Sequence, residues 1–327
     1  MKTLIRVATI FCIPVSNWSL PLLGDSPNAY LLPKGQFETS VRLWKVNDGM
    51  DLLGLKPALA PGTPDTAGDM HGTGLSIKAG VHRKLTLMLD RDRRQYDYGR
   101  DQLTIYSEQV SARIPIFDKE EKEPIFALQV SHRNQTGNNL SRLFGTVSLN
   151  NANFTFNPPV SLIFSGVRER ELALMLIATK QLKPKLTGSL FYEYSEADIM
   201  SGIATTLPSP QIQQTLSPLS YEQHKDRFGY SLNWRLDSAN QISMDYNYML
   251  LSRSKDVSDP VDVNRIINAA WSHELKTNHF VNLQARYMEN QFIGEHNFLY
   301  NTLVASRSAR RYGYLGLGYS LKFDLMD

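Results

Sequence analysis

The charged residues that could do chemistry in this sequence recur at every second position of short segments, with apolar residues between them. An arginine in such a position stays charged at any working pH and holds carboxylates or phosphates through two parallel hydrogen bonds. Acidic residues of the same parity could instead pair with these cations, because charges outside bulk water need partners. The pattern leaves two interpretations open, a polar passage that selects solutes by charge and a set of cross-strand ion pairs. This polar set comprises Arg42, Lys78, Arg133, Arg227, Arg235, Arg286, Lys322, Glu38, Asp90, Glu193, Asp245 and Glu274.

Motifs for catalysis or for metal binding are absent from the sequence. It has no HExxH motif, no Gly-rich phosphate loop and no paired spacing of metal ligands. We therefore expect no metal, no other cofactor and no enzymatic activity. The net charge is +3 and includes no basic block, so nucleic acid is not an expected partner either.

The alternation itself predicts the elements that position these charges. Between Arg227 and Asp237, apolar and aromatic residues occupy one parity and polar residues occupy the other. After a turn at 237–240 the alternation resumes as far as Leu250. A period of two is typical of a β-strand with one apolar and one polar face, so this region predicts a β-hairpin.

About twelve strands follow from the same pattern. They are expected at 36–46, 72–81, 84–92, 102–116, 124–133, 171–181, 185–196, 226–237, 241–251, 263–274, 279–290 and 310–323. Their connections alternate between short and long, which places every long loop at one end of the sheet. A soluble sandwich has no reason for this, whereas an all-β, transmembrane, antiparallel up-and-down β-barrel has short periplasmic turns and long external loops. This count treats 134–170 as one loop; strands at 154–156 and 160–164 would raise it to fourteen.

The N-terminus predicts export. Lys2 and Arg6 precede an apolar run from Val7 to Val15, in the order of a signal peptide, which we expect over 1–24. The only cysteine, Cys12, falls within it, so the mature chain would have no thiol. Beyond this segment no apolar run approaches the roughly 18 residues of a membrane helix. The mean hydropathy of −0.30 suits membrane strands that alternate apolar and polar residues.

The last expected strand carries a resemblance to a known family. Tyr319, Leu321 and Phe323 alternate with polar residues, and this segment resembles the C-terminal assembly signal of outer-membrane barrels, an aromatic–x–apolar–x–Phe pattern. In that family the Phe usually ends the chain, whereas here four residues follow it. The resemblance implies a Gram-negative outer-membrane β-barrel of no characterised subfamily. It also implies outer-membrane lipid, lipopolysaccharide and the barrel-assembly machinery as partners.

Barrel enzymes offer two catalytic comparisons. The segment from Ser131 to Asn138, with His132, is the nearest match to the signature of outer-membrane phospholipase A, but Asn134 stands where that family has its nucleophilic serine. An amide cannot be deprotonated to attack a substrate, so this activity is not expected. Omptin-type barrel proteases use Asp and His residues at the rim. The residues that expected long loops could bring to such a rim are Asp97, Asp198, His224 and His296.

Two segments depart from simple alternation. Glu108 falls on the apolar parity of its strand, together with Tyr106 and Val110. This predicts either a bulge near Ser107 or a shifted register. The strand expected at 171–181 is apolar on both faces, which indicates that an inward loop packs on its lumen side.

The chain is expected to divide into a signal peptide at 1–24, a periplasmic segment at 25–35, the barrel at 36–323 and a tail at 324–327. The function expected first is a narrow porin-like channel for small polar solutes, with a weak preference for anions because cations exceed anions in the polar set. The first alternative is a plugged barrel that acts in envelope or surface-polymer assembly through its loops, and the second is a barrel hydrolase. The residues expected to line the lumen are Arg42, Arg227, Arg235, Arg286, Glu38, Asp245 and Glu274.

Overall fold

The structure is a computed structural model that describes most of the chain. The described residues are 26–46, 70–97, 102–117, 124–149, 152–205, 219–254, 261–290, 294–297 and 311–325. The expected signal peptide lies outside them. No helix within these ranges is long and apolar enough to span a membrane.

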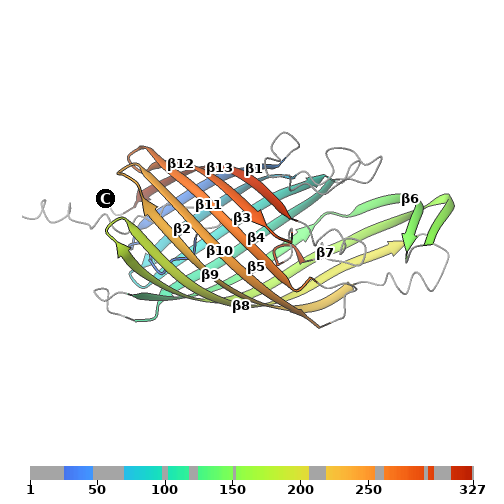
Figure 1. The fold of residues 1–327 in the computed structure, drawn as a ribbon, viewed down its shortest axis with the longest axis horizontal. Helices are drawn as coiled ribbons and strands as arrows, with labels where there is room; N and C mark the ends of the chain where they lie inside the picture. The colour runs from blue at the N-terminus through green and yellow to red at the C-terminus, as the bar shows by residue number, and fades with distance from the viewer. Residues whose placement is uncertain are drawn as a thin grey trace, which may run out of the picture.

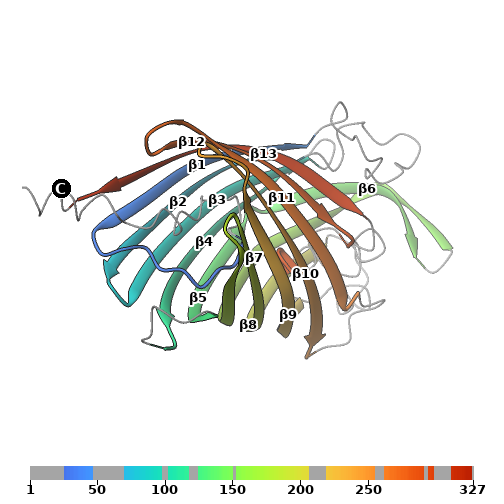
Figure 2. The same ribbon diagram turned by 60° about the vertical axis from the view of Figure 1, so that its left-hand side comes forward.

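Antiparallel strands build one closed sheet. They are β1 (Gln36–Val46), β2 (Met70–His82), β3 (Leu85–Asp97), β4 (Gln102–Pro115), β5 (Ile125–Gly137), β6 (Leu140–Leu149), β7 (Ala152–Lys183), β8 (Leu186–Thr205), β9 (Leu219–Arg235), β10 (Asn240–Arg253), β11 (Val263–Lys276), β12 (His279–Met288) and β13 (Tyr312–Asp324). β1 pairs with β13, and β5 pairs with β7 past β6. Twelve of these strands therefore form the barrel wall, as the alternation predicts (Figures 1 and 2).

The two ends of the barrel differ. At the end we call the turn end, short connections join β2 to β3, β7 to β8, β9 to β10 and β11 to β12, and β1 begins beside the end of β13. The long connections lie at the opposite end, which we call the loop end. The predicted alternation of short and long connections is confirmed for most strand pairs. Between β3 and β4, however, the long loop expected at 93–101 is wrong, because β3 continues to Asp97 and β4 begins at Gln102. There is one further exception.

That exception is the segment 134–170, for which a single loop was the wrong prediction. β5 continues to Gly137, and β6 forms a hairpin with the first part of β7 that projects beyond the barrel at the loop end (Figure 1). The register between these strands shifts between Phe144 and Thr146, opposite the prolines at 158–159. Proline cannot donate to the ladder, so the pair breaks the regular alternation by which strands are recognised. Because β6 pairs only with β7, the barrel has twelve strands and not fourteen.

The pleat of each strand separates apolar from polar side chains. On β1, Val41 and Leu43 are 54% exposed on the outer face, whereas Arg42 between them is 6% exposed. The other strands show the same arrangement, with apolar side chains outside and polar side chains inside, which is the reverse of a soluble protein. Trp234 and Trp271 lie on the outer face near the turn end. An apolar exterior and a polar interior are typical of a barrel surrounded by lipid.

The predicted hairpin after Arg227 is confirmed, and its turn has a local cause. The Asp237 carboxylate accepts hydrogen bonds from the backbone N–H groups of Ala239 and Asn240, both at 2.8 Å. An aspartate that binds the backbone two residues ahead stabilises a tight turn. The bulge predicted near Ser107 is absent, since the register of β4 with both neighbours is unbroken there. Glu108 does face outward, where it pairs with Arg91 at 3.1 Å.

Candidate functional site

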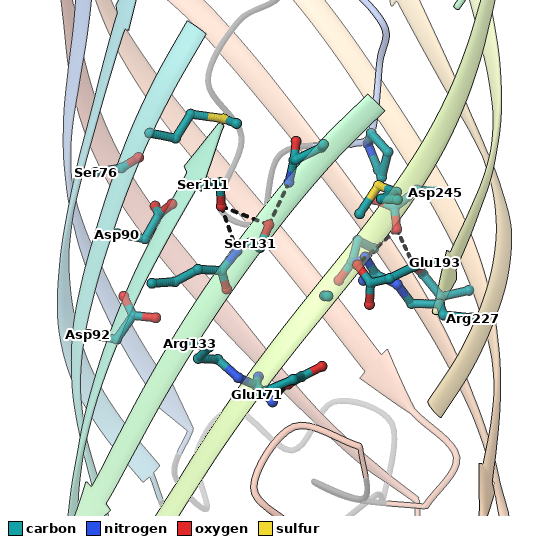
Figure 3. A pocket seen from close by; sticks show the side chains of 18 of the residues that line it. Ser76, Asp90, Asp92, Ser111, Ser131, Arg133, Glu171, Glu193, Arg227 and Asp245 are labelled. Carbon is teal, nitrogen blue, oxygen red and sulfur yellow. Dashed lines mark hydrogen bonds and ion pairs between the residues drawn. The ribbon is translucent and has the colours of Figure 1, made fainter. Parts of the chain in front are cut away.

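The centre of the lumen contains a cavity of about 250 Å³ surrounded by charged side chains. It is framed by residues of nearly every strand, and Figure 3 shows Asp90 and Asp92 on one wall with Glu193 and Arg227 on the opposite wall. Seven cationic and five acidic side chains line it. They are Arg42, Arg94, Arg113, Arg133, Lys225, Arg227 and Arg286, with Asp90, Asp92, Glu171, Glu193 and Asp245.

One charge cluster lies on β5, β7, β8 and β9. Lys225 binds Glu171 at 2.5 Å and Glu193 at 3.4 Å. Arg133 contacts both Glu171 and a second carboxylate, Glu169, the latter at 2.8 Å. These residues occupy the inward parity of neighbouring strands, so each cation lies between two acids and the cluster is nearly neutral overall.

The second charge cluster lies across the lumen on β1 and β3. Arg42 pairs with Asp90 at 3.0 Å, and Arg94 pairs with Asp92 at 3.5 Å. Both guanidinium groups also lie over the ring of Trp44, at 5.6 and 5.1 Å from its centroid. Stacking on an aromatic face adds a cation–π attraction to the ion pairs. The two arginines are thus held flat against the wall, and their side chains do not extend freely into the cavity.

Trp44 fits this place because two glycines of β2 leave room for its ring. A Cβ atom at Gly72 would lie 2.9 Å from the ring, and one at Gly74 would lie 2.6 Å from it. Both distances are shorter than real Cβ contacts, so the indole occupies the space that side chains would fill. We call this arrangement the tryptophan slot.

The segment 26–34, which we call the plug segment, crosses the lumen at the turn end. Figure 2 shows it as the blue stretch of irregular chain that leaves the start of β1 and runs across the barrel opening. Ser26 donates to Asp245 at 3.2 Å, the backbone N–H of Ala29 donates to Thr179 at 2.7 Å, and that of Leu32 donates to Thr86 at 2.9 Å. These contacts reach β10, β7 and β3, so the segment spans the lumen. The described part of the segment expected at 25–35 to be periplasmic therefore lies inside the lumen, at the turn end.

Local sequence explains how the plug segment enters the lumen. Gly35 has a φ of 89°, which lets the chain reverse between the plug segment and β1. Gly80 of β2 provides the clearance, because a Cβ atom there would lie 1.9 Å from the Pro33 carbonyl oxygen. Ala29 packs with Met175 and Ile177. This inward packing explains why the strand at 171–181 is apolar on its lumen side.

Residues 294–297, the loop-end segment, fold into the lumen from the opposite side. The backbone carbonyl of Glu295 accepts from Gln135 at 3.0 Å, and the backbone N–H of Asn297 donates to Glu169 at 2.9 Å. His296 is buried against Tyr96, with its Nδ1 2.8 Å from the Gln135 side-chain oxygen. Burial, together with nearby arginines, holds the pKa of His296 well below its ordinary value. The imidazole is therefore neutral, and it contributes shape and hydrogen bonds but no charge.

A layer of buried apolar side chains surrounds the loop-end segment and separates the charged cavity from the loop end. These residues lie where the strands approach the long loops. The layer includes Trp44, Met70, Tyr96, Leu103, Ile105, Val167, Ala197, Ile199, Tyr221, Met249, Ile266, Met288, Tyr312 and Tyr314. The cavity thus lies between this layer and the plug segment.

The structure brings most, but not all, of the expected lumen residues to this cavity. Arg42, Arg227, Arg286 and Asp245 line it. Glu38 is buried nearer the turn end, where it pairs with Lys78 at 3.1 Å and Lys322 at 3.6 Å. Arg235 and Glu274 have the inward parity but do not line the cavity, because each lies within a residue or two of a turn at the end of its strand. Both residues therefore have the lumen-facing parity that was expected of them, but they lie outside this cavity.

The residues of the possible assembly signal lie on the outer face of β13. Tyr319 is 44% exposed, and Leu321 follows it at the same parity. The ring of Phe323 stacks on Phe37 of β1 with centroids 5.4 Å apart, at the seam where the first and last strands pair.

The described part of the structure does not bring the candidate catalytic residues together at one site. His132 faces outward while its neighbour Ser131 faces the lumen. Asp198 and His224 lie on the outer parity of β8 and β9, whereas His296 is buried within the lumen. The side chain of Asp97 lies outside the described residues.

Sequence reasoning missed several charged residues of the lumen. They are Asp92, Arg94, Arg113, Glu169, Glu171, Lys225 and Glu295. Arg94 shares the parity of Asp90 on β3, and Lys225 shares the parity of Arg227 on β9, so longer strand predictions would have found both. Glu169 fell within the segment expected to be a loop. Glu295 lies outside any strand, and no periodic signal could have placed it in the lumen.

Comparison with known proteins bears on the fold. No protein-family model matches the chain, and no curated protein matches it in sequence. Among solved structures, it is similar to the translocator domain of the autotransporter NalP from Neisseria meningitidis, with a TM-score of 0.52, 10% identity and 88% of each chain covered. It is also similar to an outer-membrane channel from Pseudomonas putida F1, with a TM-score of 0.53, 11% identity, and 91% of this chain and 99% of that one covered. The chain therefore has the fold of Gram-negative outer-membrane β-barrels.

Proposed function

We propose that the protein is a gated outer-membrane channel for small polar solutes, with no enzymatic activity. The observation that carries this proposal is the charged cavity enclosed within the barrel, between the plug segment and the loop-end segment. A barrel with only a structural role has no need for a hydrated, charge-lined space. The apolar outer face supports a place in the outer membrane.

The size and charge of the cavity suggest the kind of solute. Its volume of about 250 Å³ is slightly below the roughly 300–1,000 Å³ of drug-sized ligand pockets. Seven cationic side chains face five acidic ones, so the passage has a small positive excess. Because most of these charges pair across the lumen wall, the expected preference for anions is weak.

The plug segment is the proposed gate. Its side-chain hydrogen bonds with the wall include the three described above and two more, in which the Pro27 carbonyl accepts from Ser231 at 2.9 Å and the Tyr30 carbonyl accepts from Arg113 at 3.2 Å. Ala29 adds a small apolar contact. Each such hydrogen bond contributes about 1 kcal/mol. Release of the segment would therefore cost far less than opening the barrel wall.

Conductance in planar bilayers tests this proposal. The wild type is expected to conduct rarely, and deletion of residues 26–34 is expected to give frequent, larger openings. Gly80→Ala should act in the same direction, because its methyl group collides with the Pro33 carbonyl. Gly318→Ala is the matched control, since its Cβ atom would make only ordinary contacts, the nearest at 3.4 Å from the Val41 carbonyl oxygen. If the deletion conducts no better than the wild type, the channel proposal is wrong.

Reversal potential under a salt gradient tests the charge preference. In the plug-deleted protein, Arg42→Gln should shift selectivity toward cations, because Asp90 and Asp92 lose their shared partner. Arg235→Gln provides the control, since this arginine does not line the cavity. Equal shifts in both variants would contradict the assignment of the cavity as the selective region.

A plugged barrel that acts through its loops is the second candidate. The observation that favours it is the β6–β7 hairpin, which extends beyond the barrel at the loop end (Figure 1). Absence of conductance after plug deletion, together with loss of surface-polymer assembly when residues 140–165 are shortened, would support this candidate.

A further inference from the structure

The outer face of β3, β4, β5 and β7 changes abruptly from apolar to charged. One row of neighbouring residues is Leu89, Val110, His132 and Leu172, which is apolar apart from the histidine. Val110 and Leu172 are 51% and 59% exposed. The next two rows toward the loop end are polar. In order around the barrel, they are Arg91, Glu108, Asn134 and Arg170, and then Arg93, Tyr106, Thr136 and Arg168.

Four arginines frame these two rows, and we call them the basic patch: Arg91, Arg93, Arg168 and Arg170. Arg91 pairs with Glu108 at 3.1 Å, in a pair whose side chains are 61% and 48% exposed. Within the part of the chain that the structure describes, the other three arginines have no carboxylate partner. The patch therefore carries a net charge of about +3 at the edge of the apolar belt, where a counter-charge is expected.

Two further observations indicate a ligand. A groove of about 580 Å³ runs over the outer face from β1 to β5, and Arg91, Arg93 and Asn134 are among the residues that line it. The side-chain oxygen of Asn134 and the Nε of Arg168 are buried without a hydrogen-bond partner. A buried polar atom without a partner is costly, so a ligand that satisfies both atoms would bind favourably. On the neighbouring outer face of β8 and β9, the row of Arg170 continues into the acids Asp198 and Glu222, so the arginines are a local feature of β3 and β7.

We propose that the basic patch binds lipid A, the phosphorylated glycolipid anchor of lipopolysaccharide. Arginine forms paired, charge-assisted hydrogen bonds with phosphate. β3 and β7 are three strand spacings apart, or about 14 Å at ~4.8 Å per strand, so the patch is wide enough for a disaccharide with a phosphate at each end. The acyl chains would then lie along Leu89, Val110 and Leu172, and the Asn134 oxygen would accept from a sugar hydroxyl.

The proposal rests on the proposed outer-membrane location but not on channel activity. Binding is measured by titrating purified lipid A into the detergent-solubilised full-length protein and recording bound lipid by native mass spectrometry. Arg93→Gln with Arg168→Gln is expected to weaken binding about tenfold or more, because two charge-assisted contacts are lost. Arg265→Gln is the matched control, since Arg265 is an exposed outward arginine of β11, paired with Glu289 at 3.2 Å.

A gain of binding separates a lipid site from general damage to the barrel. Glu108→Gln is expected to strengthen lipid A binding severalfold, since it removes a repelling carboxylate and frees Arg91. Equal loss in the Arg265 control, equal binding of dephosphorylated lipid A, or equal binding of phosphatidylglycerol would overturn the proposal. So would a change in oligomeric state without a change in lipid affinity. If the protein binds lipid A but does not conduct, only the proposed channel activity would be contradicted.

Discussion

The charge cluster of β7, β8 and β9 makes a quantitative prediction, because Glu171 is shared by two cations. Its side chain is 5% exposed, and that of Lys225, at 2.5 Å, is 8% exposed. Breaking a buried ion pair generally costs about 3–5 kcal/mol when one charge is left without a partner. Here Lys225 would keep Glu193 at 3.4 Å, and Arg133 would keep Glu169 at 2.8 Å. We therefore expect Glu171→Gln to lower the free energy of unfolding by only about 2 kcal/mol.

A double-mutant cycle isolates this interaction. If Glu171 and Lys225 attract each other directly, the double change to glutamine should cost about 1–2 kcal/mol less than the sum of the single changes. The assay is urea unfolding in lipid vesicles, followed by the gel mobility of unboiled samples. Glu108→Gln serves as a control, because its exposed pair with Arg91 should contribute less than about 1 kcal/mol. Additive costs for Glu171 and Lys225 would refute the cluster as a source of stability.

Further predictions address the membrane, assembly and pH. Leu232→Arg, on the outer face, should lower the free energy of unfolding in vesicles by about 2–4 kcal/mol if it lies near the bilayer centre. Asn233→Arg, on the lumen face, should be tolerated. Equal destabilisation by both variants would contradict the assignment of the two residues to opposite faces. Phe323→Ala should reduce the heat-modifiable form recovered with the outer membrane, because it removes the expected recognition aromatic; normal recovery would exclude that role. The depressed pKa of His296 means that the unfolded chain binds its proton first, so stability should fall as pH drops below about 6.5. His296→Gln should remove that part of the slope in pH-dependent unfolding.

The face that each strand residue occupies was predictable, because successive side chains of a pleated strand point to opposite faces. Once a strand is recognised, a buried position such as Arg42 follows from an exposed Val41 beside it. The depth of a residue along the lumen was less predictable, as Arg235 shows, because depth depends on where each strand ends. The plug segment left no periodic signal at all. Its burial comes from tertiary contacts with strands more than 50 residues away, such as the one between Leu32 and Thr86. The hint in the sequence was the apolar lumen side of the strand expected at 171–181, which indicated an inward loop but not which segment supplies it.

The tryptophan slot has a consequence for how this protein can diverge. The Trp44 ring fills the space beside Gly72 and Gly74, and it fits only while both positions lack a side chain. A change at either side alone should therefore lower the stability of the barrel. A side chain at either glycine position would collide with the ring, and a smaller residue in place of Trp44 would leave an empty space beside two arginines. Across descendants of this chain, a lineage that keeps the tryptophan should therefore keep both glycines. Replacement of the tryptophan alone does not free position 72, because a Cβ atom there would still lie 2.8 Å from the Arg93 carbonyl oxygen.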